Sequence, residues 1–427
     1  MKNFYFSLLL ILNSIFLIAQ NNDFNNGGGD LLWSNTANWS LLEVPTTSNT
    51  GQVRLPLLVE SLVDLDVTIK KIQTTFALAG DVSVAGANTL TVNPGVANEF
   101  GITNVSNNDI KLSFKGFVEV NNPAGFTYIE NANGASNSIE FASGSTLTLT
   151  TNLSTDQGSN NAGFIFNGTL AGNGNLRFGA NTSATFGSTS SNSGYTGQIV
   201  FLANSSATVN TADNTIFYEG PKIQVNGNSS IELNGANVFA SGITVGGTNT
   251  FTLTANANQN NMSSIIFQGG GTLNIVVGAG VSDLTFADNS ASDWSTGTVN
   301  ITNYTEGVIR FGTSNTGLTT DQLAQISADN GGAPLALDNN GYLVNESSLS
   351  VDDFDSELSK PIAYPTLATD KLYFRTPQKD VQIISLNGSV LLSKKIENQL
   401  EITVDNLSPG LYFIVFDKQN VQKFVKQ

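Results

Sequence analysis

Carboxylates are the side chains of this sequence with the clearest capacity for chemistry. Asp64 and Asp66 lie two residues apart and would project from one face of a strand. A glycosidase needs two carboxylates about 5–10 Å apart, and such a pair could supply them. Asp283, Asp288 and Asp293 recur at intervals of five and could line one turn of a repetitive fold. The alternative for both groups is a set of solvated edge or turn residues, and we favour that alternative.

A denser acidic group consists of Asp352, Asp353 and Asp355, but it falls in a Ser-rich stretch with the character of a linker. Basic residues that could serve as a lyase base are rare. Residues 21–345 hold eight of them, none in an evident acidic constellation: Arg54, Lys70, Lys71, Lys111, Lys115, Arg177, Lys222 and Arg310. The sequence therefore predicts no catalytic residue, no cofactor and no metal site.

The composition excludes several other chemistries. The 427 residues include no His and no Cys. A Ser-His-Asp nucleophile, a zinc–thiolate site and a disulfide framework are therefore impossible in this chain. The formal net charge is −16, from 18 Lys and Arg against 34 Asp and Glu. Because nucleic-acid phosphates are bound by clustered basic residues, we expect no nucleic-acid partner.

The first twenty residues are typical of a secretory signal peptide. Lys2 gives a positive start, residues 4–18 are mostly apolar, and cleavage is expected near Ala19 or Gln20, where a polar stretch begins. The alternative is an N-terminal membrane anchor, but the apolar core is short for a span and no basic stop-transfer residues follow it. We therefore expect residues 1–20 to be a signal peptide and the mature chain to be exported and soluble.

Residues 21–345 repeat one pattern of short alternating strands separated by Asn, Gly and Ser turns. A sandwich or barrel and a β-solenoid both contain many short strands. The solenoid is favoured because the pattern is long, charges are sparse, and turn Asn residues could stack into hydrogen-bonded ladders. The sequence thus predicts an all-β chain whose main domain is a right-handed parallel β-solenoid (β-helix) with turns of about 20–25 residues. One short helix is expected within residues 318–327.

Both ends of this region resemble segments of exported bacterial β-solenoids. The start carries Trp33, Asn38, Trp39, Ser40 and Pro45 before the first strands. Residues 294–344 resemble the closing segment of autotransporter-type passenger β-helices. Since the ends of a solenoid need caps, we expect them at residues 31–56 and from Trp294 onward.

A flat repetitive face could itself bind a ligand. Thr146, Thr148 and Thr150 share one strand face, as do Thr252 and Thr254, and such arrays could contact ice or glycan. We expect ordinary strand-surface residues instead, because Thr is common in strands and the array is irregular elsewhere. Aromatic rings can stack on sugars, but the Phe residues at strand positions are expected in the interior.

Residues 361–427 form a different module after an acidic, Ser-rich linker at residues 346–360. The module carries 8 Lys and Arg against 6 Asp and Glu, whereas residues 21–360 carry 9 against 28. Several short strands and an Asn387-Gly388 hairpin turn predict a small Ig-like antiparallel β-sandwich.

This module resembles the type A sorting domain of the type IX (Por) secretion system. The residues that carry the resemblance are Tyr364, Pro365, Asp370, Leu372, Gly388, Leu407, Gly410, Tyr412 and Lys426. The sequence departs from the family's Tyr-Pro-Asn-Pro at Thr366-Leu367. The resemblance implies passage through the outer membrane by the secretion machinery and removal of the tail by a sortase-like peptidase. It also implies attachment to surface lipopolysaccharide or release. The alternative is an independent Ig-like binding domain.

We therefore expect a secreted, adhesin-like or structural protein, extracellular or attached to the outer face of the outer membrane. Its partner would be a glycan, a matrix or a neighbouring cell. The alternative is a β-helix polysaccharide lyase or glycoside hydrolase. A groove lined by a carboxylate pair, or by a base beside an acidic calcium site, would favour that alternative.

Overall fold

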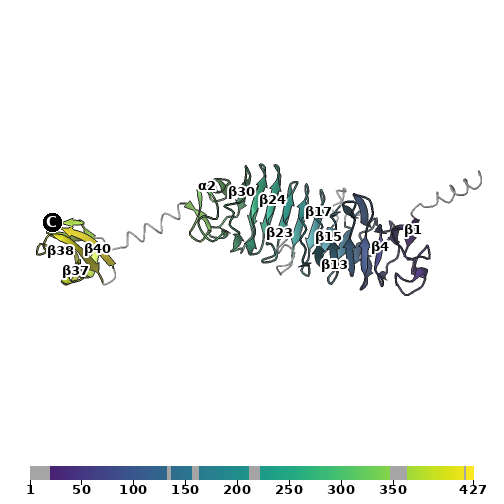
Figure 1. The fold of residues 1–427 in the computed structure, drawn as a ribbon, viewed down its shortest axis with the longest axis horizontal. Helices are drawn as coiled ribbons and strands as arrows, with labels where there is room; N and C mark the ends of the chain where they lie inside the picture. Colours follow the sequence, from purple (N-terminus) through teal and green to yellow (C-terminus); the bar gives the residue numbers. More distant parts are fainter. Residues whose placement is uncertain (1–19, 132–135, 156–162, 211–221, 347–362, 418–419) are drawn as a thin grey trace, which may run out of the picture. The chain divides into compact units, whose positions relative to one another are not determined.

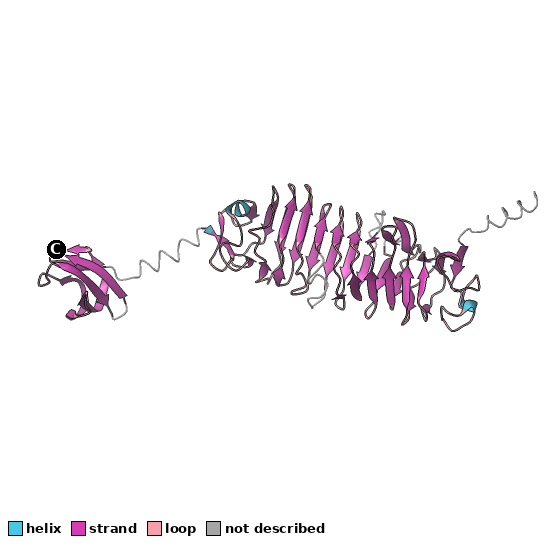
Figure 2. Ribbon diagram, in the orientation of Figure 1, coloured by secondary structure: helices cyan, strands magenta, loops and turns pink. Residues whose placement is uncertain are grey.

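The computed structural model describes residues 20–131, 136–155, 163–210, 222–346, 363–417 and 420–427. The chain divides into two compact units, one up to Asn345 and one from Glu346 onward. Strands form nearly all of the regular structure in the described residues, as Figure 2 shows, beside the short helices η1 (Thr36–Asn38) and α2 (Thr320–Ala324). This confirms the predicted all-β class and the short helix within residues 318–327. No helix among the described residues is long and apolar enough to cross a membrane.

Four parallel sheets make up the first unit. The first sheet contains β1 (Gln20–Asp23), β2 (Thr50–Leu55), β5 (Ile72–Thr74), β8 (Glu99–Asn104), β11 (Thr127–Asn131), β14 (Leu153–Thr155), β17 (Leu176–Phe178), β20 (Ile199–Phe201), β22 (Ile223–Val225), β24 (Ile243–Gly246) and β27 (Ile265–Gln268). The second contains β3 (Glu60–Leu62), β6 (Val82–Ala85), β9 (Lys111–Phe114), β12 (Ser138–Phe141), β15 (Gly163–Phe166), β18 (Ser183–Phe186), β21 (Ser206–Val209), β23 (Ser229–Leu233), β25 (Thr250–Ala255), β28 (Thr272–Val277), β30 (Thr298–Thr302) and β32 (Ile326–Ala328). The third contains β4 (Val67–Ile69), β7 (Thr89–Val92), β10 (Phe117–Val120), β13 (Thr146–Leu149), β16 (Thr169–Gly172) and β19 (Ser191–Ser193). The fourth contains β26 (Gln259–Met262), β29 (Leu284–Phe286) and β31 (Ile309–Phe311).

Consecutive strands of the chain belong to different sheets, and each pairs in parallel with a strand one turn later. Figure 1 shows the first unit as a stack whose colour changes steadily from β1 to β30. This is a parallel β-solenoid of about ten turns, which confirms the predicted main domain. Phe166 pairs with Phe186, twenty residues on, whereas Val84 pairs with Phe114, thirty residues on. The predicted turn length holds in the middle of the stack and is too short near its start.

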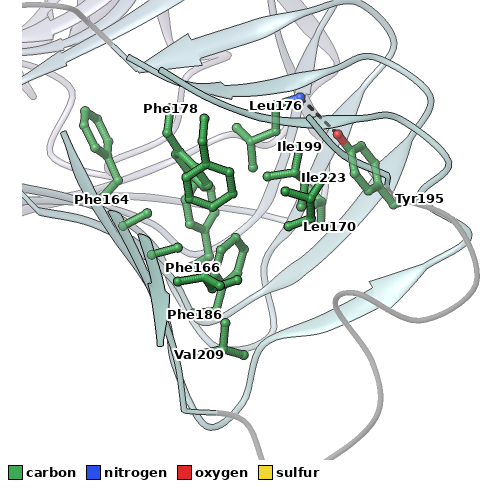
Figure 3. Packing of buried hydrophobic residues seen from close by; sticks show 14 of the residues in the cluster. Phe164, Phe166, Leu170, Leu176, Phe178, Phe186, Tyr195, Ile199, Val209 and Ile223 are labelled. Atoms are coloured by element: carbon green, nitrogen blue, oxygen red, sulfur yellow. Dashed lines mark hydrogen bonds between the residues drawn. The ribbon is translucent and has the colours of Figure 1, made fainter. Parts of the chain in front are cut away.

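Alternate side chains of each strand fill the interior, because successive residues of a strand point to opposite faces. Phe141, Phe166 and Phe186 are buried on three successive strands of the second sheet. Their ring centroids lie 5.5 and 5.1 Å apart with nearly parallel planes. Figure 3 shows Phe166 and Phe186 among the buried side chains of this region. Phe114 extends the stack on the other side of Phe141, at 5.4 Å. The interior is therefore a continuous apolar column along the axis.

Asn side chains bind the equivalent Asn one turn away. Asn234 donates to Asn210 at 2.8 Å, and Asn256 donates to Asn234 at 2.7 Å. Asn204 donates to Asn181 at 3.0 Å at another corner. These contacts confirm the predicted amide ladders, which satisfy polar side chains along the axis without charge.

Both ends of the stack are closed within the segments predicted as caps. At the start, the rings of Trp33 and Trp39 are buried edge to face at 5.0 Å, and the Trp39 indole N–H donates to the Trp33 carbonyl at 2.8 Å. At the end, Trp294 is buried against Phe267, and the antiparallel hairpin of β33 (Leu335–Leu337) and β34 (Leu343–Asn345) follows α2. Such caps cover strand edges that would otherwise pair with another chain.

The second unit is a small and mainly antiparallel structure with its own apolar core. Its strands are β35 (Ala363–Tyr364), β36 (Leu367–Ala368), β37 (Lys371–Ser385), β38 (Val390–Thr403), β39 (Gly410–Phe416) and β40 (Asn420–Lys426). The sheet order is β35-β37-β39-β40-β36, with β38 on β37. The linker predicted at residues 346–360 and the signal peptide predicted at residues 1–20 lie outside the described residues, except Glu346 and Gln20, the first residue of β1.

Candidate functional site

The first carboxylate pair proposed from the sequence does not form a pair in the structure. Asp64 accepts hydrogen bonds from the backbone N–H and the hydroxyl of Ser34, at 2.9 and 2.5 Å. Asp66 accepts one from the N–H of Thr89 at 2.8 Å. Both residues lie in the connection between β3 and β4, because β3 ends at Leu62, so they do not share a strand face. Each carboxylate fastens a different part of the backbone.

The second acidic group is also dispersed. Asp283, Asp288 and Asp293 each accept a hydrogen bond from the residue two positions later, at 2.7, 2.9 and 2.8 Å. Asp288 and Asp293 bind backbone N–H groups in two separate turns, whereas Asp283 binds the Thr285 hydroxyl at the start of β29, so the three are scattered, which is the alternative that the sequence favoured. Asp352, Asp353 and Asp355 lie outside the described residues. Within the described ranges, no three acidic side chains gather closely enough to hold a metal ion.

A surface groove of about 410 Å³ crosses β3, β6, β9 and β12 of the second sheet. We call it the charged groove, because its lining includes Glu60, Asp81, Lys111, Lys115 and Glu140. The parallel register places these residues together although eighty positions of sequence separate the two glutamates.

Each glutamate of the charged groove is held by a lysine. Lys115 Nζ lies 2.5 Å from Glu60 Oε2, and Ser83 donates to the same oxygen at 2.9 Å. Lys111 Nζ lies 2.9 Å from Glu140 Oε2. The expectation that no basic residue joins an acidic constellation is therefore wrong for Lys111 and Lys115. Their partners lie one or more turns away in the chain, where sequence spacing without a known register gives no signal.

The electrostatics of the groove keep its carboxylates ionised. Burial opposes the charged form of Glu140, but hydrogen bonds from Lys111 and its neighbours outweigh burial and hold the pKa of Glu140 below its usual value. The hydrogen bond from Lys115 lowers the pKa of Glu60. The same kind of contact with Glu140 raises the pKa of Lys111. At neutral pH both glutamates are therefore ionised and cannot act as a general acid, which must donate a proton. Lys111 is protonated and cannot act as a general base, which must accept one.

Beyond the charged groove, the outer face of the second sheet carries mostly small polar residues over β18, β21, β23 and β25, between Ile165 on β15 and Val276 on β28. Ser183, Ser206, Ser230 and Thr252 are successive register partners on β18, β21, β23 and β25. The neighbouring column contains Thr185, Thr208, Glu232 and Thr254. Since parallel strands lie about 4.8 Å apart, these columns form a flat face on which this stretch carries one charge.

The two Thr arrays noted in the sequence do not combine. Thr146 and Thr148 lie on β13 of the third sheet, and Thr252 and Thr254 lie on β25 of the second. Thr150 follows the end of β13. Each array therefore remains a short segment of a different face.

Motif residues of the C-terminal unit are divided between its core and its surface. Leu372 is fully buried, Tyr412 is 8% exposed, and Leu407 packs against the same core. The Tyr412 hydroxyl donates to the carbonyl of Ser408 at 2.7 Å. This contact resembles the tyrosine corner of Ig-like sandwiches, in which a Tyr hydroxyl binds the backbone a few residues upstream.

The remaining motif residues shape turns or face solvent. Gly388 adopts a φ of 84° in the turn between β37 and β38, a conformation that glycine accepts without strain. The Asp370 carbonyl accepts the N–H of Val404 at 2.7 Å, and Gly410 begins β39. Tyr364 is 51% exposed, and Pro365, the next residue, is also exposed.

The basic C-terminal segment is an interior strand of its sheet. β40 pairs antiparallel with β39 over seven residue pairs and parallel with β36 on its other side. Phe424 is buried in the core, and Lys426 is 9% exposed with its ammonium group on the carbonyl of Gln427. The last residues of the chain therefore help to build the fold of this unit.

Comparisons with known proteins concern this second unit. Residues 363–427 match the family described as secretion system C-terminal sorting domain. Searches among curated proteins and solved structures found no significant match to the chain. A sorting domain engages the secretion machinery and directs its passenger to the cell surface or the medium. Residues 363–427 are thus the C-terminal sorting domain of the type IX (Por) secretion system, and the β-solenoid is the passenger that it exports.

Proposed function

We propose that the exported solenoid is a structural or adhesive rod that contacts a glycan, a matrix or a neighbouring cell. The observation that carries this proposal is the flat outer face of the second sheet, with its register-aligned columns of Ser and Thr hydroxyls. A rigid face with hydroxyls at each strand can form many weak hydrogen bonds with a repetitive polymer. A stack of strands closed at both ends also presents this face without free edges.

For the second unit we propose the route that the sorting-domain resemblance implies. A sortase-like peptidase would remove the tail, and the solenoid would then be attached to surface lipopolysaccharide or released. Sequence and structure support an exported passenger, and the final anchorage is an expectation from the resemblance alone.

The second candidate function is cleavage of a polysaccharide, and the charged groove is the observation that favours it. Glu60 and Glu140 both line this groove, on β3 and β12 of the second sheet, where a polymer lying across the strands could meet both carboxylates. Against this candidate, both carboxylates are paired with lysines and both pKa values are lowered. A glycosidase acid has a raised pKa instead, so the groove as built lacks the proton donor of that reaction.

A glycan array tests the two functions together. The full chain is screened for binding, and turnover of each bound polysaccharide is followed with and without calcium. Binding without turnover is the expected result. Turnover that is lost in both Glu60→Gln and Glu140→Gln would replace the adhesive function by an enzymatic one. If the chain binds no glycan, the adhesive proposal fails and a scaffold function is left.

A further inference from the structure

Three aromatic side chains lie on the outer face of the first sheet, unlike the buried rings of the interior. Phe100 on β8 is the register partner of Tyr128 on β11, and their ring centroids lie 5.7 Å apart. Phe126 immediately precedes β11. All three are partly exposed, and so is Arg177 on β17. We call Phe100, Phe126, Tyr128 and Arg177 the aromatic strip.

A β-bulge brings Phe100 to this face. The register between β8 and β11 shifts after Tyr128, so Phe100 lies outside while Ile102 stays buried, and Gly101 is the extra residue. A Cβ on Gly101 would lie 2.5 Å from the side chain of Thr127, closer than packed atoms approach. Bulges of this kind re-aim side chains and are common beside functional sites.

Arg177 holds the rings from two turns further along the chain. Its Nε donates to Ser154 Oγ at 2.8 Å, and its Nη2 donates to the Tyr128 hydroxyl at 3.0 Å. Its guanidinium carbon lies 4.0 Å from the ring centroid of Phe126. These contacts fix the rings before any ligand arrives, so binding would cost little side-chain entropy.

Among the residues that the structure describes, no carboxylate forms an ion pair with Arg177. The ion pairs found among the described residues involve Arg54, Lys111, Lys115 and Lys371, and not Arg177. A guanidinium has five N–H donors, and the two contacts above use two of them. Arg177 therefore offers a cation with free donors beside three aromatic rings.

The opposite end of the aromatic strip has two carboxylates near its one cation. Lys71 Nζ lies 5.8 Å from the ring centroid of Phe100. Burial lowers the pKa of Lys71, and the charges of Glu130 and Glu99 oppose that shift. An anionic group on a ligand would thus be attracted to the Arg177 end and not to the Lys71 end.

We propose that the aromatic strip binds an acidic polysaccharide, with a sugar ring stacked on Phe126 and Tyr128 and an anionic substituent at Arg177. This inference rests on the proposed adhesive function and names its ligand class. Aromatic faces bind the apolar faces of sugars, and the planar guanidinium matches a carboxylate or sulfate through two parallel hydrogen bonds. The net negative charge of the chain does not prevent this contact at physiological ionic strength, because distant exposed charges are screened beyond about 8 Å.

Two probes with one backbone test the proposal. The full chain is titrated with polygalacturonate and with its methyl ester, which lacks the charge, at physiological ionic strength. We expect polygalacturonate to bind at least about tenfold more tightly than the ester, which corresponds to about 1.4 kcal/mol. Arg177→Gln should remove this preference and weaken polygalacturonate binding by at least about tenfold. Arg177→Lys keeps the charge and loses the planar guanidinium, so its affinity for polygalacturonate should lie between those of the wild type and Arg177→Gln.

A matched control lies elsewhere in the solenoid. Arg310 also stacks on a ring, with its guanidinium carbon 5.2 Å from the centroid of Tyr342, and Arg310→Gln should leave both affinities unchanged. Thermal unfolding of each variant checks that it is folded. The proposal is overturned if Arg177→Gln binds like the wild type, if the ester binds as well as polygalacturonate, or if neither probe binds. If Arg177→Gln still binds the glycan array like the wild type, the aromatic strip is not the binding site, but the adhesive function stands. If the wild type binds nothing on the array, the adhesive function is refuted as well.

Discussion

Removing one ring from the interior stack should destabilise the solenoid by an amount that the structure allows to be estimated. Phe166 is 4% exposed and lies between Phe141 and Phe186, with ring centroids at 5.5 and 5.1 Å. Phe166→Ala loses the buried ring and leaves a cavity, which together cost about 3–5 kcal/mol. The two stacking contacts, each worth about 0.5–1.5 kcal/mol beyond burial, place the expected value in the upper part of that range.

The loss should also be local, because each turn of a solenoid contacts only its neighbours. Amide hydrogen exchange of the full chain should therefore accelerate most in β12, β15 and β18. With an unfolding entropy of about 2.1 cal/mol/K per residue, a loss of this size lowers the thermal midpoint of the solenoid by roughly 4–7 °C. Urea unfolding measures the corresponding free energy.

The neighbouring residue provides the control. Ile165 lies on the same strand but points to the outer face, where it is half-buried. Ile165→Ala should change the free energy of unfolding by less than about 1 kcal/mol, since few surface substitutions cost more. Equal losses in Phe166→Ala and Ile165→Ala would show that the stacked column does not hold the turns together, and the account of the interior would be wrong.

Three further predictions concern single contacts. Tyr412→Phe removes the hydrogen bond to the Ser408 carbonyl, so denaturation of the sorting domain should show a loss of about 1 kcal/mol. Deletion of residues 424–427 removes Phe424 and both residues that pair with β36, so the domain should become protease-sensitive and export should fail, while intact export would exclude a structural need for β40. The folded pKa of Glu140 lies below its unfolded value near 4.5, so its contribution to stability is present above that pH and is lost as the pH falls through the folded pKa. Urea midpoints in acid and at neutral pH should therefore differ less in Glu140→Gln than in the wild type.

Strand identity could be predicted from the sequence because it depends on local alternation. In residues 139–141 and 231–233 the apolar positions that alternate in sequence are the ones that the structure buries. The Asn ladders could be predicted for a similar reason, because they require only that Asn is frequent in the turns. Asn210, Asn234 and Asn256 form one such ladder. These features require no knowledge of which turn follows which.

Register could not be predicted in the same way. Register partners one turn apart are separated by 19 residues from Val53 to Ile72 and by 31 from Asn22 to Val53, so a fixed period does not align Glu60 with Lys115 or Lys111 with Glu140. The charged groove depends on that alignment and was therefore missed, although all of its charged residues are visible in the sequence. The charged groove can be found from the sequence only if the first and last residue of each turn are known.

The sorting motif shows a different limit. Its residues could be recognised from the sequence, but their division into two tasks could not. Leu372 and Tyr412 build the core, whereas Tyr364 is exposed beside Tyr373, with ring centroids 5.8 Å apart. Some residues of the motif are needed for folding and others are free for recognition, and the sequence alone does not distinguish the two groups.

Most strand phenylalanines lie in the interior as expected, and Phe100 is an exception whose cause is a single glycine. Alternation assigns Phe100 and Ile102 to one face because they are two residues apart. The extra residue in β8, Gly101, shifts the register, so Ile102 remains inside and Phe100 faces Tyr128 outside. A side chain at this position would collide with Thr127, so the bulge depends on glycine. A break of register can therefore create a distinctive outer surface, and the aromatic strip lies at one such break.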